Sequence, residues 1–100
     1  MFTVRRTKEF DSWFLSLRDG VTRARLAARL RKAQLGNLGD VKSLESGVYE
    51  MREDFGPGWR LYYIKRGRLL IVMLGGGDKS TQAKDIAKAV KLAAQIEDSR

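Results

Sequence analysis

The sequence predicts an α+β fold in a single domain that covers residues 1–100. Three observations lead to this prediction. The chain is 100 residues long, which allows one modest hydrophobic core but not two. Its patterns follow the order of a short β-prone segment, two helices, three or four strands and a last helix, and helices grouped before antiparallel strands are typical of α+β proteins. No internal repeat or low-complexity segment interrupts this order.

The chain begins with an edge strand and a helix. Residues Phe2–Arg5 are β-prone, and Thr7 is a suitable N-cap for a helix over Lys8–Arg18. Four apolar residues of this helix recur at the spacing of one buried face: Phe10, Trp13, Phe14 and Leu17. We expect this face to be part of the core.

A second helix is expected from a Thr22 cap to about Leu35, and a short connection predicts that it lies antiparallel to the first. Its inner face would consist of Leu26, Ala27, Leu30 and Ala33. A basic stripe of Arg25, Arg29 and Lys32 would lie outside. This stripe is equally compatible with RNA binding and with a solvated helix face. Gly36 and Asn37 then end the helix.

Strands are expected from residue 41 onward. A short strand over Val41–Leu44 carries Lys42, and the strands Val48–Arg52 and Trp59–Ile64 flank a tight connection at Phe55–Gly58. A third strand, Arg68–Leu74, is apolar on both faces and should therefore be central, covered by helices on both sides. Because alternate residues of a strand share a face, four side chains are expected on one patch: Glu50, Arg52, Arg60 and Tyr62.

Three glycines follow the apolar strand, and we expect them to form a tight turn. Ser80 or Thr81 would then cap the last helix. A strand followed by glycines and Lys-Ser-Thr suggests a phosphate-binding P-loop, but Asp78 stands where that motif requires glycine before the lysine. Nucleotide hydrolysis is therefore not expected.

Composition narrows the class of protein and of partner. The net charge is +8, and each half of the chain carries 10 basic and 6 acidic residues, so the excess belongs to the whole domain. Such a field favours a polyanionic partner, either nucleic acid or an acidic protein, although it can also serve solubility alone. The absence of cysteine and histidine excludes disulfides and the usual zinc and triad ligands. No apolar run reaches the roughly 20 residues of a membrane span, so we expect a cytoplasmic protein.

Four segments together resemble a known family. They are Gly36-Asn37-x-Gly39-Asp40-x-Lys42, Gly47-Val48-Tyr49-Glu50-Met51-Arg52, Gly56-Pro57-Gly58-Trp59-Arg60-Leu61-Tyr62-Tyr63 and Gly76-Gly77-Asp78-Lys79-Ser80-Thr81-Gln82. In order, spacing and length the chain resembles the RelE/ParE superfamily of type II toxins, within the HigB-like subgroup of addiction-module killer proteins. The resemblance implies a strand and helical hairpin packed on a twisted antiparallel sheet of about four strands, with a C-terminal helix.

The resemblance also implies a function. RelE-type toxins are metal-independent endoribonucleases that cut mRNA on the ribosome through the ribose 2′-hydroxyl, whereas ParE-type toxins poison DNA gyrase without cutting RNA. Either kind would be neutralised by a cognate antitoxin, and operator DNA would be contacted only through that antitoxin. No cofactor and no metal are expected. Because both kinds share one fold, the fold alone does not decide between them.

Cleavage through the 2′-hydroxyl requires a base, cations for the phosphorane and an acid for the leaving oxygen. By position, Arg60 and Lys79 match the family's phosphate ligands. Glu50 falls where some members have a base, and Arg52 would assist it. The resemblance leaves Asp85 near a position where several members have tyrosine or histidine. Lys42, Tyr62, Arg25, Arg29 and Lys32 are the expected RNA contacts. The alternative is that Glu50, Arg52 and Arg60 form a surface ion network.

Overall fold

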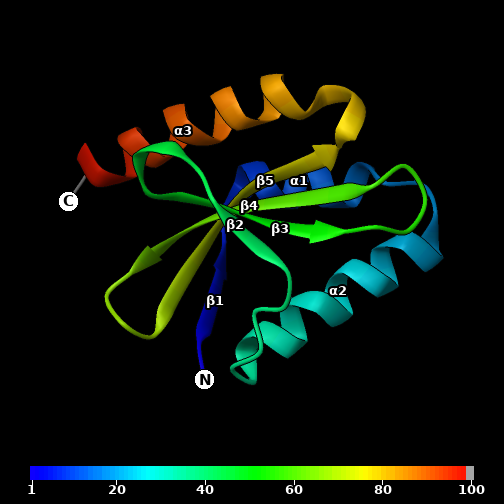
Figure 1. Ribbon diagram of the computed structural model, residues 1–100, viewed down its shortest axis with the longest axis horizontal. Coiled ribbons are helices and arrows are strands. Elements are labelled where there is room, and N and C mark those ends of the chain that lie inside the picture. Colours follow the sequence, from blue (N-terminus) through cyan, green and yellow to red (C-terminus); the bar gives the residue numbers. More distant parts are fainter. Residues whose placement is uncertain (99–100) are drawn as a thin grey trace.

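The computed structural model describes residues 1–98 as one sheet with helices on both faces (Figure 1). The strands are β1 (Thr3–Arg6), β2 (Val41–Ser43), β3 (Val48–Glu53), β4 (Trp59–Arg66) and β5 (Leu70–Asp78). The helices are α1 (Lys8–Ser16), α2 (Gly20–Gln34) and α3 (Gln82–Asp98), with short 3₁₀ turns η1 (Glu45–Gly47) and η2 (Lys79–Thr81). The predicted α+β class and the predicted order of elements are confirmed.

The sheet has five strands in the order β1-β5-β4-β3-β2. Strands β2 to β5 pair antiparallel, as expected, but β1 pairs parallel with β5, with Thr3 beside Leu70 and Arg6 beside Met73. The expectation of an antiparallel sheet of about four strands was therefore wrong for its first strand. Most of the chain lies between the two strands of this parallel pair. The local pattern at Phe2–Arg5 therefore does not predict which strand β1 pairs with.

Each face of the sheet has its own hydrophobic cluster. Helices α1 and α2 cover one face, where Phe10 and Leu26 pack against Met51, Leu61 and Met73. Helix α3 covers the other face. There, Ala89 and Ala93 of α3 pack against five side chains of β3, β4 and β5: Val48, Tyr62, Ile64, Val72 and Leu74. The prediction of a central strand that is apolar on both faces is confirmed for β5, whose Ile71 and Val72 point into different clusters.

The two N-terminal helices begin at different kinds of cap. The Thr7 side chain accepts a hydrogen bond from the Phe10 amide, which confirms the predicted N-cap of α1. The predicted Thr22 cap of α2 was wrong, because the helix already begins at Gly20 and Asp19 accepts from the Val21 amide. Thr22 lies within the first turn, where its hydroxyl donates to Asp19. An aspartate caps as well as a threonine, so both were chemically suitable.

The glycine run does not form the turn expected of it. Gly75, Gly76 and Gly77 continue β5 as far as Asp78, and the carboxylate of Asp78 then accepts from the Ser80 amide to start η2. A Cβ at Gly76 would lie 2.4 Å from the Trp13 ring, and one at Gly77 would lie 1.9 Å from the Asp85 carboxylate. These glycines therefore permit close packing of helices on the strand, one from each side.

No helix within residues 1–98 combines the length and the apolar character that crossing a membrane would need.

Candidate functional site

Strand register brings four of the predicted side chains onto the same face of the sheet, the one covered by α3. Glu50 of β3 lies opposite Tyr62 of β4, and Arg52 lies opposite Arg60. Strand β2 pairs with β3 on the side away from β4, and Lys42 of β2 lies opposite Glu50. The predicted grouping of Glu50, Arg52, Arg60 and Tyr62 is confirmed by this register, because residues directly opposite in an antiparallel pair share a face.

A patch that acts on RNA would have to be open to solvent, but the centre of this one is buried. Glu50 is 1% exposed and Arg60 is 6% exposed. Gln82, at the start of α3, donates from its Nε2 to Glu50 Oε2 at 2.8 Å. Glu50 Oε1 lies 4.0 Å from Arg60 Nε, while Arg60 Nη1 donates to the carbonyls of Trp59 and Glu53. The ion pair between Glu50 and Arg60 that the alternative predicted is therefore present, but the alternative was wrong to place it at the surface.

Tyr62 adds a hydroxyl to the buried cluster. Its side chain is fully buried, and its hydroxyl has no hydrogen-bond partner among the described residues. Burial, followed by the negative charges of Glu50 and Asp85, raises the pKa of Tyr62 well above its ordinary value. Tyr62 therefore stays a neutral donor at physiological pH. Asp85 is held nearby on α3, where it accepts from the Thr81 hydroxyl.

Arg52 has a different partner from the one expected. Instead of orienting Glu50, its Nη2 donates to Asp40 Oδ1 at 3.0 Å, and its side chain is 37% exposed. That hydrogen bond from Arg52 holds the pKa of Asp40 below its usual value. Sequence reasoning missed Asp40 and Gln82 as members of the site. Both belong to the segments quoted for the resemblance, which was the one signal pointing to them.

Lys79 lies at the end of β5, on η2, and is exposed. Its amide donates to the Gly58 carbonyl, and its side chain lies against Gly58, where an added Cβ would come within 2.8 Å of the lysine Cε. Gly58 also has a φ of +83°, which favours glycine. The Lys79 side chain therefore packs against the turn between β3 and β4.

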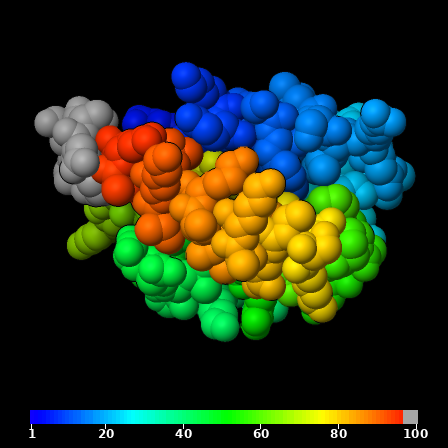
Figure 2. Space-filling model, turned by 90° about the horizontal axis from the view of Figure 1, so that it is seen from above, coloured from blue at the N-terminus to red at the C-terminus, as the bar shows by residue number. Residues whose placement is uncertain are grey.

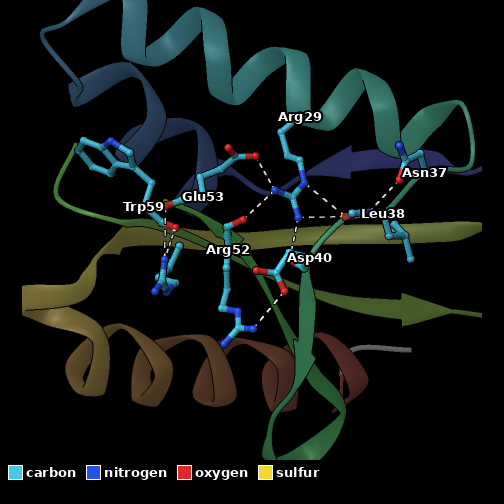
Figure 3. Close-up of polar contacts among 9 residues, drawn as sticks. Arg29, Asn37, Leu38, Asp40, Arg52, Glu53 and Trp59 are labelled. Carbon is cyan, nitrogen blue, oxygen red and sulfur yellow. Dashed lines mark hydrogen bonds and ion pairs between the residues drawn. The ribbon is translucent and has the colours of Figure 1, made fainter. Parts of the chain in front are cut away.

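Arg29 is not an RNA-contacting residue on the outside of α2, as expected, but a buried one that is 7% exposed. Figure 3 shows its guanidinium surrounded by acceptors. Nε and Nη2 donate to the Leu38 carbonyl, Nη2 to the Asp40 carbonyl at 2.8 Å, and Nη1 to the Arg52 carbonyl at 2.8 Å and to the Glu53 carboxylate. Arg29 thus joins α2 to both ends of the β2–β3 hairpin.

The Gly36-Asn37-x-Gly39-Asp40 segment is built around this arginine. Gly36 has a φ of +99° at the end of α2, as its predicted role requires, and the Asn37 side chain accepts from the Gly39 amide. A Cβ on Gly39 would lie 3.0 Å from the guanidinium. The helical spacing contained a signal for the burial of Arg29, because Arg29 lies three residues after the buried Leu26. Ala27 was predicted to lie on the inner face but is exposed.

Tyr62 was also predicted to contact RNA, but its side chain is fully buried, so this prediction was wrong. The other three predicted RNA contacts are exposed but lie on different parts of the molecule. Arg25 and Lys32 are exposed on α2, on the opposite side of the sheet from Glu50, and the Arg25 guanidinium lies 3.9 Å from the centre of the Phe55 ring. Lys42 is exposed on the edge strand β2. Of these three, only Lys42 borders the Glu50 face.

The Glu50 face has an excess of hydrogen-bond donors. Three buried donor atoms make no hydrogen bond within residues 1–98: Arg52 Nε, Arg60 Nε and the Tyr62 hydroxyl. Unpaired donors on cationic groups suit an anion such as phosphate, and a nearby carboxylate can accept a proton. Within the same residues, no group of three histidines, cysteines or carboxylates gathers closely enough to hold a metal ion.

Comparison with known proteins gives a close relative. An uncharacterized protein of Haemophilus influenzae (strain Rd) is 42% identical over 93 residues, which cover 93% of this chain and 94% of that protein. No protein-family model matches the chain.

Proposed function

This chain belongs to one family with the Haemophilus influenzae protein, and we propose that it is the toxin of a type II toxin-antitoxin module, acting in the cytoplasm as a ribosome-dependent mRNA endoribonuclease. The observation that carries the proposal is the register of β3 and β4. It places an acid, two guanidiniums and a phenol on one face, and Lys79 follows at the end of β5. Further support comes from the four segments that resemble RelE/ParE toxins and from the matching order of elements.

In the proposed reaction, the ribose 2′-hydroxyl attacks its own 3′-phosphodiester. Glu50 takes the proton of that hydroxyl. The bond from phosphorus to the 5′-oxygen breaks as the 2′,3′-cyclic phosphate forms, and the leaving 5′-oxygen takes a proton from water. Arg60 and Lys79 stabilise the phosphorane, whose charge increases in the transition state. Arg52, which is accessible, holds the incoming phosphate. Gln82 donates a hydrogen bond to the Glu50 carboxylate. The substrate hydroxyl must replace Gln82 as the donor to Glu50 before cleavage.

The test is to induce the protein in bacterial cells for a short time and map the 5′ ends of transcripts. We expect new ends within translated regions. Glu50→Gln and Arg60→Lys should each lower their yield by at least about 100-fold, the usual loss when a general base or a charge stabiliser is removed. Lys91→Met, an exposed change on α3, is the matched control. Urea unfolding of each variant shows whether it is folded, and full cleavage by folded Glu50→Gln would refute the proposal.

Burial of Glu50 and Arg60 favours a second candidate, a ParE-like toxin that binds DNA gyrase and cuts no RNA. In such a toxin Glu50 and Arg60 would have no catalytic role and would not need to reach a substrate. Under this alternative, induction raises a DNA-damage response before translation falls, no new 5′ ends appear, and Glu50→Gln stays toxic. The same induction experiment therefore separates the two candidates.

A further inference from the structure

Strand β5 is longer than the strand that covers its outer edge. Pairing with β1 ends at Arg6 beside Met73, whereas β5 continues to Asp78. The last contact on that edge comes from Thr7, whose amide and hydroxyl both donate to the Met73 carbonyl. From residue 75 to residue 78, β5 is paired with β4 on its other side only, and Leu74 lies at a shift in the register of these two strands.

A groove of about 710 Å³ opens along this free edge, between α1 and α3. The two helices, blue and orange, lie next to each other on the face seen in Figure 2. Gly75 and Gly76 form part of the wall and have no side chains to block the strand. Trp13 of α1 and Leu92 of α3 line the two sides. The groove thus combines an accessible backbone with apolar walls.

The charged groups that line the groove balance one another. Lys8 and Glu9 come from α1, and Asp85 and Lys88 come from α3. The groove itself therefore selects its occupant by backbone pairing and apolar contact. The whole chain, with a net charge of +8, attracts acidic partners from a distance.

We propose that the free edge of β5 where it lines the groove, from residue 74 to residue 76, binds an extended segment of an acidic partner protein as an added strand in line with β1. Three residues of a strand span about 10 Å. The peptide backbone would pair with the β5 edge, and alternate apolar side chains would turn toward Trp13 on one side and Leu92 on the other. A helix docked in the groove would leave the edge groups of β5 unpaired. This inference does not depend on the proposed toxin function.

The test uses a phage-displayed library of random heptapeptides, selected on the full chain. We expect enriched sequences with alternating apolar residues and acidic flanks. Gly75→Val should weaken binding at least about tenfold, because a Cβ at Gly75 meets nothing within 4 Å and the added side chain has room to project into the groove without disturbing the fold. Ala28→Val, which introduces the same side chain on the exposed face of α2, should bind as the parent does. Thermal unfolding of both variants confirms that they are folded.

Two further measurements separate backbone pairing from other modes. The most enriched peptide should slow hydrogen exchange in residues 74–76, and N-methylation of its alternate amides should abolish binding. The proposal is overturned if no peptide is enriched, if Gly75→Val binds equally well, if N-methylation has no effect or if protection appears at β2 instead. Self-association lost in Gly75→Val would identify a second copy as the occupant and would also overturn it.

Discussion

Two arginines four residues apart on α2 have opposite environments. Arg25 is exposed and lies over the Phe55 ring, whereas Arg29 is buried with its guanidinium surrounded by three carbonyls and a carboxylate. A buried cation is stable only when its donors are used, and Arg29 uses Nε, Nη1 and Nη2. The same residue type therefore serves the surface at one position and the core at the other.

We predict that Arg29→Met lowers the free energy of unfolding by about 3 kcal/mol, the cost of breaking a buried ion pair and leaving its partners unsatisfied. Urea unfolding monitored by circular dichroism measures this. The control is Lys32→Met on the same helix, which is exposed and should change stability by less than about 0.5 kcal/mol. Equal effects of the two changes would contradict the role given to Arg29.

Tyr63 makes stability depend on alkaline pH. Burial raises the pKa of Tyr63 to about 12, whereas tyrosine in an unfolded chain titrates near its model value of 10.0. Between these values the folded state holds a proton that the unfolded state has lost, so stability falls as pH rises from 10 to about 12. Tyr63→Phe should reduce this fall by about 1 kcal/mol per pH unit. Urea unfolding at several pH values, with phenolate absorbance as a second probe, checks it.

At the scale of elements, the end of β5 shows why glycine stands where a strand is covered closely. Gly76 lies under the Trp13 ring of α1, and Gly77 lies beside Asp85 of α3. Gly75, by contrast, has no atom within 4 Å of where a Cβ would lie. The three neighbouring glycines therefore differ in the space around them. Packing requires glycine at Gly76 and Gly77 but not at Gly75.

Gly76→Ala should destabilise the protein by about 1–3 kcal/mol, because the new methyl group overlaps the Trp13 ring and the helix must shift. Gly75→Ala is the matched control, one residue away, and should be neutral or slightly stabilising. Thermal and urea unfolding of the two variants compare them directly. A loss of stability in Gly75→Ala as large as that in Gly76→Ala would show that the run is constrained by backbone conformation instead.

Across the whole molecule, exposed positive charge is spread over both sides of the sheet. Arg25 and Lys32 lie on α2, Lys42 on β2 and Lys79 on η2. Such a distribution attracts polyanions without fixing how they bind, because field strength depends on net charge more than on individual contacts. Specific binding would have to come from the Glu50 face.

Non-specific binding of single-stranded RNA should therefore weaken strongly with salt. Each phosphate contact contributes about 0.7 to the slope of log affinity against log salt concentration. Lys32→Met should reduce that slope by about this amount if Lys32 contacts RNA, as the sequence predicts. Filter binding at several salt concentrations measures it. Arg31→Met on the same helix, equally exposed, distinguishes a position-specific contact from a general effect of charge.

The sequence by itself determined the order of elements, the Thr7 cap, the end of α2 at Gly36 and the two-sided apolar character of β5. It also determined that Glu50, Arg52, Arg60 and Tyr62 share a face. All of these follow from local preference or from the alternation of side chains within a strand and its hairpin partner.

Only the tertiary structure decided which parts of that pattern are buried. Glu50 is covered because Gln82, 32 residues away, begins a helix over it. Arg29 is buried because the loop at Leu38 and the end of strand β3 at Arg52 supply its acceptors. The parallel pairing of β1 with β5 and the close packing on Gly76 and Gly77 likewise join distant segments. Side-chain periodicity states which face a residue occupies, but the cover over that face is set by segments far away in the chain.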